Sequence, residues 1–134
     1  MQLHHVLTQL LLILALLPMT IVSAAEYELR TIATGLDKPW SIAEVDENAF
    51  LVTEKGGRLI KLLKDGSITA IKGAPEVYFA SQGGLLEVLP DPGFSQNRTV
   101  YLSFSGGDKS ANRTTVMRAV LDGDTLKNPE TILE

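Results

Sequence analysis

The feature that most constrains the fold is an internal repeat of short apolar runs separated by glycine-rich turns. Three runs recur in the same order, pairing 43–45 with 86–88, 50–54 with 100–104, and 58–62 with 116–120. Each copy has room for up to four antiparallel strands in about 40–50 residues, the size of one blade of a β-propeller. The copies share a pattern with few identities, so a sandwich containing two similar hairpins is the alternative.

The segments between the turns have the composition of β-strands. Ala49–Glu54 and Arg58–Leu63 are rich in apolar residues and flank a Gly56-Gly57 turn, and Asp65-Gly66 is a strong hairpin signal. Sustained helical periodicity is missing beyond residue 25. The sequence therefore predicts an all-β fold, with strands expected at 26–34, 40–45, 49–54, 58–63, 67–71, 84–89, 100–104, 114–121 and 131–133.

Two copies of the repeat cannot close a propeller, which needs about four to eight blades. Alone they would leave an unpaired strand edge and an uncovered sheet face, which favour aggregation. We therefore expect residues 26–134 to be the N-terminal part of a longer β-propeller domain and to hold its first one to two blades.

The first 25 residues differ from the rest and predict a signal peptide. They contain no Asp, Glu, Lys or Arg, and an apolar run at Leu10–Leu17 precedes the small residues Ser23, Ala24 and Ala25. Cleavage after Ala24 or Ala25 would satisfy the small-residue rule, although the segment lacks the usual basic start. An uncleaved tether is the alternative, but Leu10–Ala25 is shorter than the ~20 apolar residues of a spanning helix. We expect a periplasmic or secreted protein without a stable membrane span.

The remaining composition excludes several classes of function. The net charge of −4 provides no basic surface for nucleic acid. There are no cysteines, so stability must come from a core or from ligands. Both histidines lie in the first 25 residues, which leaves residues 26–134 without the commonest general base and metal ligand.

One stretch, Ser81–Pro90, combines a polar amide with two glycines directly before an apolar run. Gly83 and Gly84 allow a tight turn or a close approach of another group to the backbone. Gln82 can donate and accept hydrogen bonds at that turn. On these residues alone, a structural junction between a loop and a strand remains the alternative to a binding site.

Four motifs in order give a resemblance to a known family over nearly all of residues 26–134. They are Gly35-Leu36-Asp37-Lys38-Pro39-Trp40-Ser41-Ile42-Ala43, Leu51-Val52-Thr53-Glu54-Lys55-Gly56-Gly57-Arg58-Leu59, Gln82-Gly83-Gly84-Leu85-Leu86-Glu87-Val88 and 91–103. Together they resemble the soluble quinoprotein sugar dehydrogenases of the glucose/sorbosone dehydrogenase family, and in particular the bacterial aldose sugar dehydrogenases.

The resemblance implies a six-bladed propeller that binds pyrroloquinoline quinone (PQQ) and calcium. Members of this family oxidise the C1 hydroxyl of an aldose sugar to a lactone, with a histidine base and hydride transfer to the quinone. The quinone accepts the hydride, and the protein positions the sugar. The electron acceptor that reoxidises the quinone is not specified by the resemblance.

Carried over by position, Gln82 corresponds to a glutamine at the mouth of the active site, near sugar and quinone. Gly83 and Gly84 would let the backbone pass close to the cofactor. The resemblance gives structural roles to two further residues, Trp40 at a blade boundary and Arg58 as the partner of a neighbouring acid such as Glu54. The departures from the family pattern, at 46–48, 87 and 93, are mild.

The catalytic histidine, calcium ligands and PQQ-binding Arg and Lys residues of the family have no counterparts here, so we expect no catalytic residue or metal ligand in this chain. The aspartates at 37, 46, 91, 108, 122 and 124 are typical of turns and lack EF-hand spacing. By itself this segment is expected to be inactive. The alternatives are a secreted non-catalytic β-propeller that binds a partner and, with less support, a lactonase-type propeller.

Overall fold

The computed structural model describes residues 27–134, so the predicted signal peptide lies outside the described residues. Residues 31–134 form one compact unit, while 27–30 belong to a separate unit and are exposed coil. The strand expected at 26–34 is wrong, because residues 27–36 form no strand. The alternation of apolar residues does not by itself produce a strand here, since the described chain offers this segment no partner strand.

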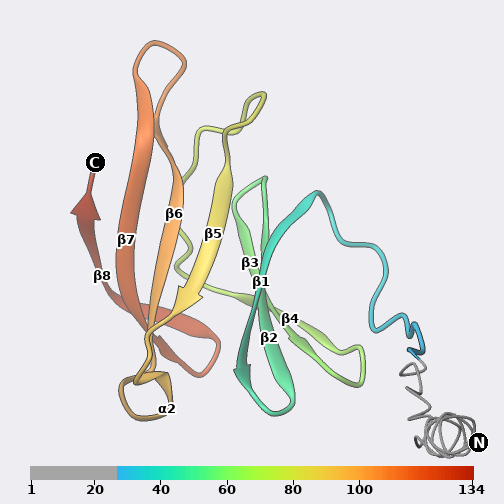
Figure 1. Cartoon of the computed structure of the whole chain (residues 1–134). Coiled ribbons are helices and arrows are strands. Elements are labelled where there is room, and N and C mark those ends of the chain that lie inside the picture. The colour runs from blue at the N-terminus through green and yellow to red at the C-terminus, as the bar shows by residue number, and fades with distance from the viewer. Residues whose placement is uncertain (1–26) are drawn as a thin grey trace, which may run out of the picture. The chain divides into compact units, whose positions relative to one another are not determined.

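The first four strands form one antiparallel sheet, which we call blade 1 (Figure 1). They are β1 (Pro39–Asp46), β2 (Ala49–Glu54), β3 (Arg58–Leu63) and β4 (Ile68–Ile71). Their order in the sheet is their order in the chain, as expected of strands connected by short turns. Glu54 pairs with Arg58 across the β2–β3 turn, so the predicted hairpin at Gly56-Gly57 is confirmed.

The next four strands repeat this arrangement in a second antiparallel sheet, blade 2. They are β5 (Leu85–Pro90), β6 (Thr99–Gly107), β7 (Asn112–Asp122) and β8 (Thr125–Leu133), with a one-turn helix, α2 (Phe94–Asn97), between β5 and β6. The first strands of the two blades, β1 and β5, lie side by side (Figure 1). The predicted all-β class and the two blade-like units are confirmed.

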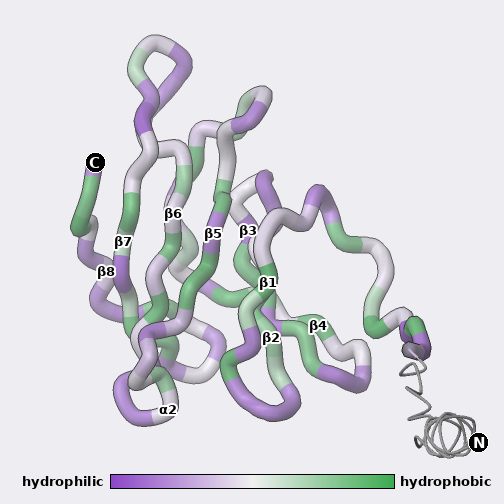
Figure 2. Tube along the Cα trace, in the orientation of Figure 1, coloured by the Kyte–Doolittle hydropathy of each residue, from purple (hydrophilic) through white to green (hydrophobic). Residues whose placement is uncertain are grey.

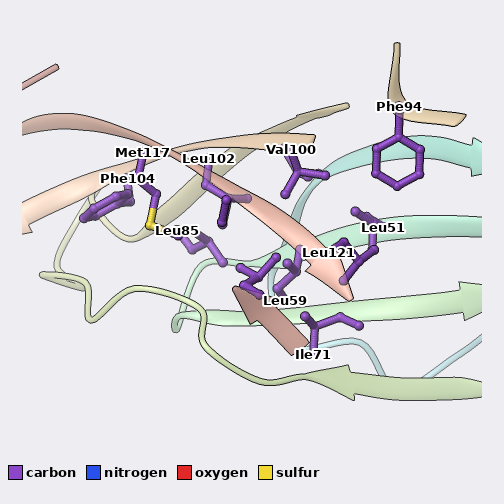
Figure 3. Packing of buried hydrophobic residues seen from close by; sticks show 13 residues of the cluster. Leu51, Leu59, Ile71, Leu85, Phe94, Val100, Leu102, Phe104, Met117 and Leu121 are labelled. Carbon is purple, nitrogen blue, oxygen red and sulfur yellow. The ribbon is translucent and has the colours of Figure 1, made fainter. Parts of the chain in front are cut away.

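The main core lies between the blades. Successive side chains of a strand point to opposite faces, and alternate residues of β6 and β7 are buried accordingly. Leu51, Leu59 and Ile71 of blade 1 meet an apolar layer of blade 2 (Figure 3), made of Leu85, Val88, Phe94, Val100, Leu102, Phe104, Met117, Ala119, Leu121 and Leu126. The two sheets are therefore held together by a shared hydrophobic core.

The opposite face of blade 1 is apolar as well. Val52, Ile60 and Leu62 are buried there, with Leu36 and Phe50 packed against them. Polar residues concentrate at turns, as Figure 2 shows for the turn between β6 and β7. Apolar residues on both faces are expected of a sheet that stacks in a layered β-fold. Within residues 27–134, no helix combines the length and hydrophobicity needed to cross a membrane.

Candidate functional site

The stretch that contains Gln82 lies in the connection from blade 1 to blade 2, directly before β5. The N–H of Gly83 donates to the carbonyl of Ala80 at 2.8 Å, which closes a four-residue turn. Ser81 within this turn has a φ of 51°, the left-handed conformation that is uncommon for a residue with a side chain. Gln82 is exposed, and no side-chain hydrogen bond of residues 27–134 involves its amide. The amide is therefore available to a ligand.

Close contacts within the chain explain why the two residues after Gln82 are glycines. A Cβ at Gly84 would lie 2.2 Å from the carbonyl oxygen of Lys55, and one at Gly83 would lie 2.8 Å from that of Tyr78. Gly84 also has a φ of 133°, which a side chain would strain. The close approach seen here is thus between backbone segments. An additional approach of these glycines to a cofactor stays a prediction.

The same junction is fixed by backbone hydrogen bonds to both blades. The N–H of Leu85 donates to the carbonyl of Lys55 at 3.0 Å, on the β2–β3 turn of blade 1. The N–H of Ser105, in β6 of blade 2, donates to the carbonyl of Gly84 at 2.9 Å. Gly84 is buried between these two partners. The backbone next to Gln82 is therefore anchored on both sides.

Next to this junction, polar side chains of β1 and β2 form hydrogen bonds with β5. Thr53, fully buried, accepts from the N–H of Ser41 at 3.1 Å and donates to the carbonyl of Leu86 at 2.5 Å. The hydroxyl of Ser41 donates to Glu87 Oε1 at 2.8 Å. The pairing of β5 with β6 is irregular between Leu85 and Val88, which leaves the carbonyl of Leu86 for its contact with blade 1. The contacts fix the position of β5 relative to blade 1.

Lysine and aromatic side chains gather around the strand ends near Gln82. The ammonium of Lys55 lies 5.0 Å from the ring centre of Trp40 and donates to the carbonyl of Ser81 at 2.9 Å. The ammonium of Lys38 lies 5.0 Å from the ring centre of Phe79. Such cation–aromatic contacts contribute about 0.5–1 kcal/mol at exposed sites. These contacts hold the ammonium groups of Lys38 and Lys55 against aromatic rings.

The structure also places the two residues predicted to be structural. Arg58 Nη1 lies 3.0 Å from Oε2 of the buried Glu54, so the predicted pair is confirmed. The other oxygen of Glu54 accepts from the N–H of Asp37 at 2.8 Å. Trp40 is half exposed and borders a hollow of about 210 Å³ with Val52 and Leu62, on the face of blade 1 opposite blade 2. Its packing at a boundary with another blade stays a prediction.

Three of the six aspartates behave as turn residues, whereas Asp124 forms an ion pair with Lys61. Asp46, Asp91 and Asp108 each accept a hydrogen bond from the backbone N–H two residues later, at 2.7–2.8 Å. The side-chain amide of Asn97 and the N–H of Gly93 lower the pKa of the Asp91 carboxyl below its ordinary value. The hydrogen bond to Asp91 raises the pKa of the Tyr101 hydroxyl. Hydrogen bonds within turns therefore account for Asp46, Asp91 and Asp108.

No group of three or more His, Cys, Asp or Glu side chains suited to a metal occurs within residues 27–134. The hollow of about 410 Å³, bordered by Glu76, Phe104 and Arg113, does not include Gln82. The site offers one exposed amide next to a backbone that is anchored by hydrogen bonds, with the ammonium of Lys55 on the preceding residue. This arrangement can bind and orient a polar ligand.

Comparisons with known proteins place these two blades in a family. Residues 36–134 match the family described as Glucose / Sorbosone dehydrogenase. The chain is 37% identical over 95 residues to an aldose sugar dehydrogenase of Escherichia coli, covering 69% of this chain and 26% of that protein.

Solved structures show the same similarity. A crystal structure of glucose dehydrogenase matches with 41% identity and a TM-score of 0.70, over 74% of this chain and 30% of that one. The PQQ-bound form of aldose sugar dehydrogenase from Streptomyces coelicolor matches with 28% identity and a TM-score of 0.70, over 78% of this chain and 32% of that one. The chain thus spans less than a third of the length of each of these three relatives.

Proposed function

Because the chain belongs to the glucose/sorbosone dehydrogenase family, we propose that it is the N-terminal portion of a quinoprotein that oxidises aldose sugars. In this proposal residues 26–134 supply two blades of a six-bladed propeller, and residues 1–25 direct the protein to the periplasm or outside the cell. The reaction converts the C1 hydroxyl of the sugar to a lactone. The quinone would supply the chemistry by accepting the hydride.

The observation that carries the proposal is the exposed amide of Gln82 on its anchored junction. Its oxygen can accept from a sugar hydroxyl, and its N–H groups can donate to a sugar or quinone oxygen. Because both neighbouring segments are fixed by backbone hydrogen bonds, the conformational freedom lost on binding is that of the Gln82 side chain alone. The role that we propose for Gln82 is to bind and orient the sugar next to the quinone.

The proposal assigns the remaining chemistry to residues beyond those described here. Residues 26–134 contain no histidine that could take the proton of the C1 hydroxyl. Calcium and most contacts to PQQ would likewise be provided by other blades. We therefore propose that residues 26–134 are inactive alone. Reoxidation of the quinone requires an electron acceptor, which these residues do not identify.

The test uses the full-length gene product, loaded with PQQ in the presence of calcium. Reduction of an artificial dye acceptor is followed after addition of common aldoses, with the protein lacking PQQ as the control. The proposal predicts dye reduction that needs both the sugar and PQQ. No turnover with any common aldose would contradict it and would favour a secreted propeller that binds a partner without catalysis.

A further inference from the structure

Lys55 contacts the turn that carries Gln82 through its side chain and the following backbone through its carbonyl. Its ammonium donates to the carbonyl of Ser81 at 2.9 Å. Its carbonyl accepts from the N–H of Leu85 at 3.0 Å, and its own N–H donates to the carbonyl of Lys38 at 3.1 Å. A single residue of the β2–β3 turn thus contacts the backbone on both sides of Gln82.

The ammonium of Lys55 contacts Ser81, which has the least favourable backbone conformation in that turn. Ser81 has a φ of 51°, a conformation that costs a residue with a Cβ about 1–2 kcal/mol. Such a residue keeps its conformation only where the surrounding contacts enforce it. The carbonyl of Ser81 leads directly to the peptide N–H of Gln82, so a donor on this carbonyl restrains the peptide from which Gln82 projects.

The ammonium of Lys55 is itself held in place. It lies 5.0 Å from the ring centre of Trp40, at the start of β1. A hydrogen bond from a charged donor is stronger than one between neutral groups. The hydrogen bond to Ser81 is solvent-exposed, and Ser81 and Trp40 together define where the charge of Lys55 lies. The contact to Ser81 is therefore a specific one.

We propose that Lys55 is a positioning residue, whose ammonium maintains the left-handed turn at Ser81 and thereby directs the amide of Gln82. Lys55 acts through the turn and needs no contact with the sugar. The consequence for sugar binding rests on the function proposed above. The consequence for the turn does not, since it concerns only groups within this chain.

The first test measures amide hydrogen exchange by NMR in the full-length product and in its variants Lys55→Met, Lys55→Arg and the control Lys127→Met. Lys127 is an exposed lysine of β8. Exchange at Gly83, whose N–H closes the turn, should accelerate at least about threefold in Lys55→Met. Exchange at Leu85 should not change, because its acceptor is the backbone carbonyl of Lys55. Lys55→Arg should restore much of the protection at Gly83.

Two outcomes of this test would overturn the proposal. Unchanged exchange at Gly83 in Lys55→Met would show that the ammonium does not maintain the turn. Faster exchange at Leu85 and throughout both blades would show a general effect on folding. A second variant, Ser81→Gly, removes the strain because glycine adopts a positive φ freely. In that background Lys55→Met should have a smaller effect on Gly83, and an undiminished effect would also contradict the proposal.

The second test measures sugar oxidation in the full-length product. Lys55→Met should raise KM for the aldose about three- to tenfold and leave kcat within about twofold, since it weakens the placement of a binding group. Lys55→Arg should restore KM, and Lys127→Met should match the wild type. An unchanged KM in Lys55→Met would overturn the role in sugar binding. If the wild type oxidises no sugar, the proposed function fails, while the exchange experiment still decides the role of Lys55 in the turn.

Discussion

The carbonyl oxygen of Lys55 lies 2.2 Å from where a Cβ at Gly84 would be. The two blades therefore approach each other at this point more closely than any residue with a side chain permits. Their contact continues through a hydrogen bond from Leu85 to Lys55 and through the shared core. The junction that carries Gln82 is consequently part of the interface between the blades.

The first prediction concerns this approach. Gly84→Ala should reduce the free energy of unfolding by about 3 kcal/mol, because the Cβ meets a backbone oxygen and the φ of 133° is unfavourable. Gly56→Ala is the matched control, since a Cβ there would meet nothing within 4 Å. Urea denaturation of both variants measures the difference. Equal stabilities of the two variants would contradict the account of the interface.

The second prediction concerns the buried hydroxyl of Thr53. Thr53→Val keeps the shape of the side chain but leaves the N–H of Ser41 and the carbonyl of Leu86 without this partner. Unsatisfied buried groups cost about 1–3 kcal/mol, so the unfolding free energy should fall by that amount. Thr69→Val, at an exposed position of β4, should change it by less than about 0.5 kcal/mol. A Thr53→Val protein as stable as the Thr69→Val protein would show that these contacts do not stabilise β5.

The third prediction concerns pH. The amide of Asn97 and the N–H of Gly93 lower the pKa of Asp91 in the folded chain below 3.8. A lowered folded pKa stabilises the protein above the unfolded value, and this contribution is lost as pH falls through the folded pKa. Stability should therefore decline in acid, below pH 3.8. Asp91→Asn, which cannot titrate, should show a shallower decline in urea denaturation at decreasing pH; the wild-type slope in this variant would contradict the assignment.

The sequence predicted most of the fold where turns mark both ends of a strand. The predicted and observed bounds of β2 and β3 agree, because glycine and aspartate turns limit them. The start of β8 was missed, since Lys127, Asn128 and Pro129 are poor strand residues and Asn128 has a φ of 51°. There the pairing with β7, shifted in register, overrides local preference.

The candidate site was predicted in part. The partnership of Arg58 with an acid such as Glu54 was implied by the family resemblance, and the observed register of β2 and β3 places these two residues opposite each other. The relation of Lys55 to Ser81 could not be predicted, because it joins residues far apart in the chain and depends on how the blades pack. No local pattern reports such a contact. The contact of Gln82 with sugar or quinone stays a prediction.

The central claim is that the amide of Gln82 binds the sugar in a PQQ-dependent oxidation, and it is tested most directly by kcat/KM for an aldose. We compare the full-length product with its Gln82→Leu variant, which keeps the size of the side chain but lacks the amide. Gln96→Leu, an exposed glutamine of α2, is the control. We predict that Gln82→Leu lowers kcat/KM at least about tenfold, while Gln96→Leu stays within about twofold of the wild type. Wild-type kcat/KM in the Gln82→Leu variant would contradict the account.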